Sequence, residues 1–162
     1  MNWMLSHRAD PRAVAIADRH YNRQKPGSPQ FVPPGRCIVL LSSDERAVWV
    51  TSWPYAEYVR HAWAGAWMNS MFRNEGDTLS STLILEAIAI TRGIYGDPPP
   101  LGMVTFVDTK KVKSTSDPGA CYRHAGFRRV GWTKGGLLAL QLLGDEMPSA
   151  IALASTERRD GR

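Results

Sequence analysis

Cysteine is scarce in this sequence, and its placement excludes two kinds of site. The two cysteines, Cys37 and Cys121, are far apart and fit no C-x-x-C spacing of a metal or redox motif. We favour core packing for both, although Cys121 stands in a glycine-containing segment where a thiol could face a site. The sequence therefore gives no reason to assign metal ligands.

Long apolar runs are absent as well. No segment approaches the roughly 20 apolar residues that a membrane-spanning helix needs, and the N-terminus lacks the pattern of a signal peptide. We therefore expect a cytoplasmic protein that has no membrane partner.

Acidic residues are outnumbered by basic ones, 15 to 20, which gives a net charge of +5. The basic residues gather near the N-terminus, around Lys110 and Lys111, and between Arg123 and Lys134. Basic clusters of this kind suit a polyanionic partner, although a solvated charged surface is the ordinary alternative. The oligomeric state stays open, with a homodimer among the options.

Length and composition predict one globular domain. A chain of 162 residues with 43% hydrophobic residues and six tryptophans can bury one core but is too short for two ordinary domains. We expect the domain to span residues 1–145. Residues 146–162 form a predicted C-terminal tail whose charged end we expect to be disordered.

The stretch from Met71 to Gly93 joins a polar, glycine-containing loop to an apolar helix. Asp77 or Thr78 is the predicted N-cap of this helix, and Gly93 its C-terminal stop. Apolar residues fall on several faces, which indicates burial. Free backbone N–H groups and the helix dipole favour an anion at such an N-terminus; ordinary capping is the alternative. The apolar positions are Leu79, Leu83, Leu85, Ala87, Ile88, Ala89, Ile90 and Ile94.

The rest of the pattern predicts a mixed fold. We expect an α/β (α+β) protein with a mostly antiparallel sheet flanked by helices. A proline-rich loop separates the first helix from the second strand, and residues 55–66 are ambiguous between a short helix and an aromatic loop. The expected strands are 2–6, 36–42, 46–53, 67–72, 101–108, 127–133 and 136–143, and the other helices are 10–21 and 119–125.

Two motifs in this order resemble the GNAT acyltransferase fold. The loop before the buried helix carries Arg73 and Gly76, which fit the family's pyrophosphate-binding pattern, while Thr78 replaces its second glycine. A tyrosine in a short helix, Tyr122, is followed by Gly126 and Phe127 as in the family. The resemblance implies acetyl-CoA or another acyl or aminoacyl donor, of unknown identity. The implied donor-binding residues are Arg73, Asn74, Gly76, Thr78, Ser80 and Ser81.

A narrower resemblance is to the Mom-type DNA-modification proteins, a GNAT-like group that alters adenine in phage DNA and blocks host restriction enzymes. The residues that carry it are His20-Tyr21, Arg73-Asn74, Ser80-Ser81, Asp108 and Tyr122 with Phe127. It implies DNA as the partner. The implied catalytic residues are Asp108, Tyr122, Arg73, Ser81 and His20.

Each of these residues also has an ordinary structural explanation. Tyr122 resembles the family's acid for the leaving group, but a core tyrosine is the alternative. Asp108 could orient or deprotonate the attacking nitrogen where the central strands of the fold splay, or simply start a turn. His20, Tyr21 and Arg23 suit a stacked base and a phosphate, or a helix end. Lys110 and Lys111 are further candidates for substrate contact.

Three functions are therefore open. The first is a Mom-like transferase that modifies nucleobases in DNA, adenine above all, and protects phage DNA from restriction. The second is a coenzyme A-dependent N-acetyltransferase of a small amine or a protein. The third is a non-catalytic DNA-binding module on a GNAT scaffold, in which Asp108 and Tyr122 are structural.

Overall fold

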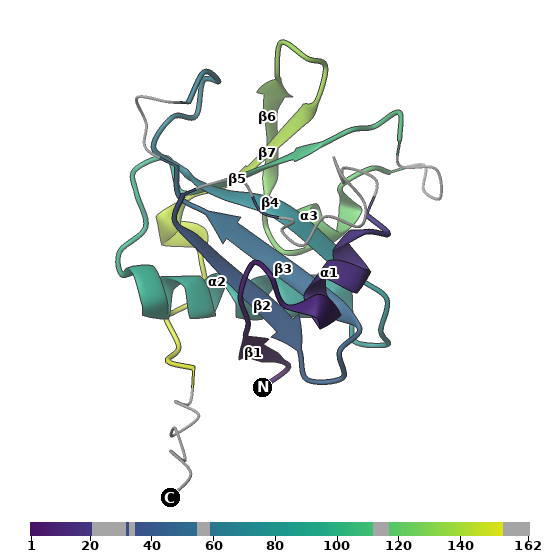
Figure 1. Ribbon diagram of the computed structural model, residues 1–162. Coiled ribbons are helices and arrows are strands. Elements are labelled where there is room, and N and C mark those ends of the chain that lie inside the picture. Colours follow the sequence, from purple (N-terminus) through teal and green to yellow (C-terminus); the bar gives the residue numbers. More distant parts are fainter. Residues whose placement is uncertain (21–31, 33–34, 55–58, 112–116, 154–162) are drawn as a thin grey trace, which may run out of the picture.

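The computed structural model describes residues 1–20, 32, 35–54, 59–111 and 117–153 (Figure 1). These residues form one open sheet of seven strands with three α-helices. Neighbouring strands are antiparallel with one exception, so the expected mixed, mostly antiparallel class is confirmed.

The sheet has the order β1-β2-β3-β4-β5-β7-β6, and the exception is the parallel pair of β4 and β5. All the predicted strands are present with shifted ends. Strand β4 continues two residues beyond the predicted end, so Arg73 and Asn74 lie in a strand and not in a loop. The strands are β1 (Trp3–Leu5), β2 (Cys37–Ser42), β3 (Ala47–Ser52), β4 (Trp67–Asn74), β5 (Met103–Val107), β6 (Arg128–Trp132) and β7 (Leu138–Leu142).

Helices cover both faces of the sheet. Helix α1 (Pro11–Ala17) packs on one face, in a small core that includes Val39 and Leu41 of β2. Helices α2 (Ser80–Tyr95) and α3 (Ala120–His124) pack on the other face, in a larger core. Because side chains alternate along a strand, Ile38 and Leu40 belong to that second core.

Helix α1 begins as predicted but ends early. Asp10 caps it by accepting a hydrogen bond from the backbone N–H of Arg12 at 3.0 Å, and Pro11 occupies the first turn. The predicted extension toward Tyr21 is wrong, because the helix ends at Ala17 and a turn leads to His20. His20 donates its backbone N–H to the carbonyl of Ala17 at 2.9 Å, which closes that turn.

Both predicted ends of α2 are wrong. Leu79 occupies the N-cap position and forms no side-chain cap bond, while the Asp77 side chain is 99% exposed and lies 3.5 Å from Arg46. At the other end the helix runs through Gly93 and stops at Gly96, which has a φ of 84°. Leu79 and Ile94 lie at the two ends and are exposed, whereas the middle of the helix is buried as expected.

Gly93 has a packing role instead. A methyl group at this position would overlap the carbonyl oxygen of Ile151, because residues 147–153 pass along the C-terminal half of α2. Ile151 donates its N–H to Ala89 at 3.1 Å, and the guanidinium of Arg92 donates to the carbonyl of Pro148 at 2.9 Å. Part of the predicted tail therefore packs on this helix, while residues 154–162 lie outside the described residues.

Gly93→Ala tests this packing. An alanine inside a free helix would stabilise it by about 1 kcal/mol, but here the added methyl meets a backbone carbonyl, and we expect a net destabilisation of about 1–3 kcal/mol. Denaturant unfolding measures the change. In a chain that ends at Pro148 the same substitution should be neutral or stabilising; equal losses in both chains would contradict the explanation.

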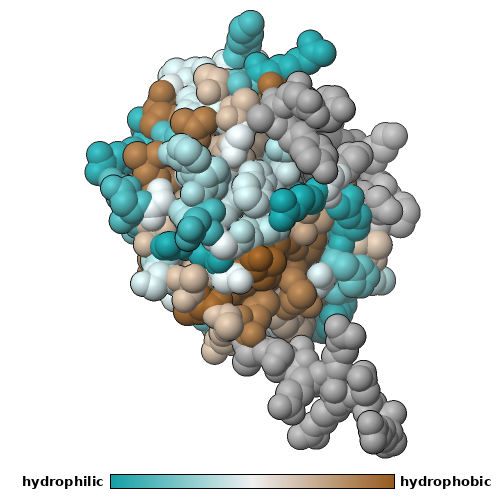
Figure 2. Space-filling model, turned by 90° about the vertical axis from the view of Figure 1, so that its left-hand side faces the viewer, coloured by the Kyte–Doolittle hydropathy of each residue, from teal (hydrophilic) through white to brown (hydrophobic). Residues whose placement is uncertain are grey.

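The surface shown in Figure 2 is mixed, with apolar residues gathered in the lower central part of the view and hydrophilic residues over much of the rest. Within the described ranges, no helix combines the length and the apolar character needed to cross a membrane.

Candidate functional site

The parallel strands β4 and β5 separate in the middle of the sheet. They pair at three positions only, and the last pair is Asn69 with Thr105. A β-bulge lies at this point, because Thr51 of β3 pairs with Asn69 while Val50 pairs with Met71, which leaves Ser70 as an extra residue. A bulge bends its strand, so β4 turns away from β5 and the sheet opens into a fork.

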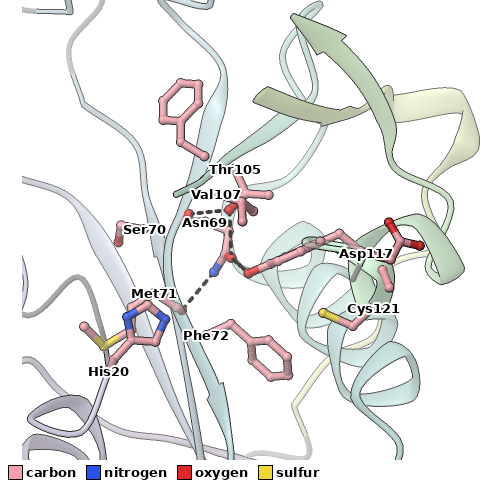
Figure 3. Close-up of a pocket in the computed structure, with 13 residues that line it drawn as sticks. His20, Asn69, Ser70, Met71, Phe72, Thr105, Val107, Asp117 and Cys121 are labelled. Atoms are coloured by element: carbon pink, nitrogen blue, oxygen red, sulfur yellow. Dashed lines mark hydrogen bonds between the residues drawn. The ribbon is translucent and has the colours of Figure 1, made fainter. Parts of the chain in front are cut away.

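A pocket of about 290 Å³ occupies this fork. Its lining comes from both sides of the sheet: Met71 belongs to the core beside α1, whereas Phe72, Val107 and Tyr122 belong to the core beside α2 and α3. The pocket therefore passes between the strands from one face toward the other, as Figure 3 shows with His20 and Cys121 on opposite sides. The remaining lining residues are Asn69, Ser70, Thr105, Phe106, Asp117, Gly119 and Ala120.

Asn69 lies at the floor of the pocket, where its side chain forms hydrogen bonds with four surrounding residues. Its amide nitrogen donates to the carbonyls of Val50 at 3.0 Å and of Met71 at 2.9 Å, which are the two residues paired across the bulge. Its amide oxygen accepts from the hydroxyl of Tyr122 at 2.5 Å and lies 3.3 Å from that of Thr105. The side chain is 3% exposed, so this network joins the bulge to the tyrosine in a buried setting (Figure 3).

Tyr122 is held by its ring as well as by its hydroxyl. The ring makes edge contacts with Phe72 and Phe127, at centroid distances of 6.3 and 5.4 Å. Gly126 ends α3 in a Schellman motif. The backbone N–H of Phe127 donates to the carbonyl of Tyr122, and that of Gly126 donates to the carbonyl of Arg123, both at 3.0 Å. Gly126 has a φ of 104°, which explains why glycine follows this helix.

The rim of the pocket carries a carboxylate and a thiol. Asp117 accepts hydrogen bonds from Arg123 and Arg129, so two cations surround its charge. Burial raises the pKa of the Cys121 thiol, which is therefore neutral at pH 7. Cys121 lines the pocket and also packs against the larger core.

The predicted donor-binding residues form a separate cluster at the end of β4. Arg73 donates Nε–H to Glu75 at 2.7 Å, and Arg19 donates two bonds to the same carboxylate at 2.6 and 2.7 Å. Hydrogen bonds from the two guanidiniums lower the pKa of Glu75 from about 4.5 to about 2, and Arg19 contributes more than Arg73. The ion pair of Arg73 with Glu75 is what we expect if the arginine has only a structural role. The other two guanidinium nitrogens of Arg73, however, bond to none of the described residues.

Asn74 ties this cluster to the start of α2. Its amide nitrogen donates to the carbonyl of Thr78 at 2.7 Å and to Oγ of Ser80 at 3.0 Å, and its oxygen accepts the N–H of Gly76 at 3.0 Å. Ser81 lies in the first turn of the helix and is half-buried. The six predicted residues are therefore neighbours, next to the pocket along the chain but outside its lining.

The remaining predicted residues are divided. Among the described candidates outside this cluster, His20 and Tyr122 line the pocket, whereas Asp108 does not. The Asp108 carboxylate accepts the N–H of Lys110 at 3.0 Å, which is the turn geometry weighed against a catalytic role. Lys110 and Lys111 are exposed beside it, and Tyr21 and Arg23 lie outside the described residues.

Asn69, Thr105 and Asp117 were not predicted from the sequence. No recognised motif around Asn69 predicts a bulge, and the contacts of Asn69 depend on β5 and α3, which come much later in the chain. Asp117 lies within residues 109–118, a lysine-bearing segment that the sequence predicts as a polar loop. The only available signal was the adjacent polar pair Asn69 and Ser70, which interrupts the apolar residues from Trp67 to Phe72.

The lowered pKa of Glu75 predicts an acid-sensitive contribution to stability. A carboxylate with a depressed pKa stabilises the fold fully above its unfolded value near 4.5, and this contribution is lost as the pH falls toward 2. Glu75→Gln should therefore lower stability by about 1 kcal/mol at pH 7 and by less at each lower pH. Thermal unfolding at several pH values measures this. Glu45→Gln, which breaks an exposed pair with Arg12, is the control; the same pH trend there would contradict the assignment.

Comparison with known proteins identifies no relative, so a function can be argued only from the geometry of the pocket and the residues around it. No protein-family model matches the chain, and neither a curated protein nor a solved structure matches it significantly. Across the described residues, the structure places no group of three or more histidine, cysteine, aspartate or glutamate side chains where they could hold a metal ion.

Proposed function

We propose that this protein is a GNAT-like transferase, resembling the Mom-type proteins, which transfers an acyl or aminoacyl group to a nucleobase in DNA. The observation that carries the proposal is the fork between β4 and β5, with the Tyr122 hydroxyl buried at its floor. A pocket that reaches both faces of a sheet lets a donor and an acceptor approach one point from opposite sides, which direct transfer requires.

The proposed chemistry needs one acid and one path for a proton. The acceptor nitrogen forms a bond to the carbonyl carbon of the donor, the carbon–sulfur bond breaks, and the nitrogen releases a proton to solvent water, which in turn restores the phenol of Tyr122 after it has protonated the thiolate. Tyr122 gives its phenolic proton to the departing sulfur, and such acid catalysis contributes roughly 10²- to 10⁴-fold in rate. Because its hydroxyl hydrogen bonds to Asn69, rotation of the O–H alone redirects the proton while the oxygen stays fixed.

The residues beyond the pocket suit a phosphate-bearing donor. Glu75 carries one negative charge against two guanidiniums, so the cluster with Arg19 and Arg73 has a net charge of about +1. No side-chain cap bond is formed at Leu79, and the helix N-terminus beside Ser80 and Ser81 attracts anions. Acetyl-CoA and other phosphate-bearing acyl donors fit this arrangement, and His20 lies on the face opposite α3, where the acceptor would enter.

Analysis of nucleosides tests the proposal. DNA from cells that express the protein is digested, and the nucleosides are separated and weighed by mass spectrometry. We expect a mass-shifted base, adenine first, which disappears with the Tyr122→Phe variant. A normal profile together with acetylation of an added amine favours the N-acetyltransferase, whereas DNA binding without either product favours the non-catalytic module.

A further inference from the structure

The hairpin of β6 and β7 projects beyond the body of the sheet (Figure 1). Strand β6 lies at the edge of the sheet, and four of its five residues are exposed. Trp132 at the end of this strand is 61% exposed and Val130 is 40% exposed. A tryptophan this exposed, on an element that protrudes, points to a contact surface because burying its large ring would be strongly favourable.

Hydrogen bonds at the tip of the hairpin fix the backbone next to Trp132. Thr133 donates its N–H to the carbonyl of Leu137 at 2.9 Å, and its own carbonyl accepts from Gly136 at 3.0 Å. The hydroxyl oxygen of Thr133 accepts the N–H of Leu137 at 3.1 Å. With the turn closed by three hydrogen bonds, little conformational entropy is lost when the aromatic ring binds a partner.

Charge selects the kind of partner. The sequence contains no acidic residue between Asp117 and Asp145, but four basic ones. Three of them pair with acids, Arg123 and Arg129 with Asp117 and Arg128 with Glu146. The exposed Lys134 pairs with none of the described carboxylates, so positive charge remains at the tip. A partner that offers phosphates to Lys134 and flat aromatic faces to Trp132 is a nucleic acid.

A second copy of this chain fits the same edge poorly. Strand β6 carries adjacent arginines, Arg128 and Arg129, which would oppose like charges in a symmetric strand pair. Its register shifts between Arg129 and Gly131, so the ladder is interrupted at Val130. Both features are devices by which proteins prevent pairing at sheet edges.

We infer that the hairpin of β6 and β7 docks on DNA, with the Trp132 ring stacked against a base and Lys134 beside a phosphate. This inference rests on the proposed function and names the surface that brings the substrate to the pocket. Arg129 of β6 binds Asp117 on the pocket rim, and Ala139 of β7 pairs with Phe106 in the pocket lining. The hairpin and the pocket are therefore connected rigidly. An enzyme that extrudes a base benefits from a ring that fills the vacated stack.

Binding of fluorescently labelled duplex DNA, followed by anisotropy, tests the inference. We expect Trp132→Ala to weaken binding about 10-fold, as loss of one stacking contact does, and Lys134→Ala to reduce the slope of log affinity against log salt by about one. Leu5→Ala is the matched control, because Leu5 is 62% exposed on β1 at the opposite edge of the sheet. Its affinity should equal that of the wild type.

Unchanged affinity of Trp132→Ala, with the melting temperature of the wild type, overturns the inference. Loss of a wild-type dimer in Trp132→Ala, seen by analytical ultracentrifugation without any effect on DNA binding, also overturns it in favour of a second copy. The proposed function fails separately. Binding that depends on Trp132, without any modified base, rejects the transferase alone, whereas base modification that survives Trp132→Ala at wild-type affinity rejects the docking surface alone.

Discussion

Tyr122→Phe is expected to lower the rate of group transfer by about 10²- to 10⁴-fold and to leave the protein folded. The phenol is the proposed proton donor at the floor of the fork, and phenylalanine keeps the ring contacts with Phe72 and Phe127 while removing only the hydroxyl. Loss of the hydrogen bond to Asn69 should cost about 1 kcal/mol in unfolding free energy. Single-turnover rates and thermal unfolding on the same sample separate the two effects.

Tyr95→Phe is the control for this experiment. The Tyr95 hydroxyl is buried and has no hydrogen-bond partner among the described residues, and its ring packs against Trp53 and Trp67, away from the pocket. We expect its removal to leave activity unchanged and stability equal or slightly higher, because an unsatisfied buried polar group is lost. Full activity of Tyr122→Phe would assign Tyr122 a structural role and remove the acid from the proposed mechanism.

A single strand positions both halves of the candidate site. Asn69 near the start of β4 holds the pocket floor, and Asn74 at its end organises the loop that leads into α2. The extension of β4 through Asn74 places Arg73 opposite Val48 of β3, so the arginine is fixed by a ladder. The distance between the pocket floor at Asn69 and the cluster around Arg73 and Asn74 is thus set by strand geometry, which varies little.

The elements could be predicted because their causes are local. Alternating or continuous apolar residues predicted the strands, and Asp10-Pro11 predicted the start of α1 correctly. The predicted end of α2 was wrong because Gly93 does not stop the helix. The glycine is needed there because the carbonyl oxygen of Ile151, which is distant in the sequence, lies too close for a side chain. A glycine that makes room for a carbonyl and one that ends a helix have the same letter in a sequence.

The site could be predicted only in part for the same reason. Tyr122 belongs to a local motif, because Gly126 and Phe127 form the Schellman turn that follows it and both can be recognised in the sequence. Asn69 acts through a bulge that arises from pairing with β3 and through bonds to β5 and α3. Such a network is a property of the assembled sheet, so a list of candidate residues drawn from motifs omits it.

Asn69→Leu is expected to destabilise the fold by about 3–4 kcal/mol and to lower transfer as strongly as loss of the tyrosine hydroxyl. Leucine has nearly the same shape but removes the amide that donates to the carbonyls of Val50 and Met71 and accepts from the Tyr122 hydroxyl in a buried setting. Each unsatisfied buried group costs about 1–3 kcal/mol, and the losses overlap because they belong to one network. The released hydroxyl then loses its fixed position at the floor of the pocket.

Two threonines separate the catalytic effect from the loss of stability. Thr105→Val removes one hydroxyl bonded to Asn69, at 3% exposure, whereas Thr91→Val removes one bonded to Thr51 and Ala87 and lies outside the pocket. We expect each to cost about 1 kcal/mol in stability, with transfer reduced only in Thr105→Val. Rates are measured at a temperature where every variant is folded. If Asn69→Leu keeps wild-type transfer under that condition, the network is structural and Tyr122 needs no partner to hold its hydroxyl.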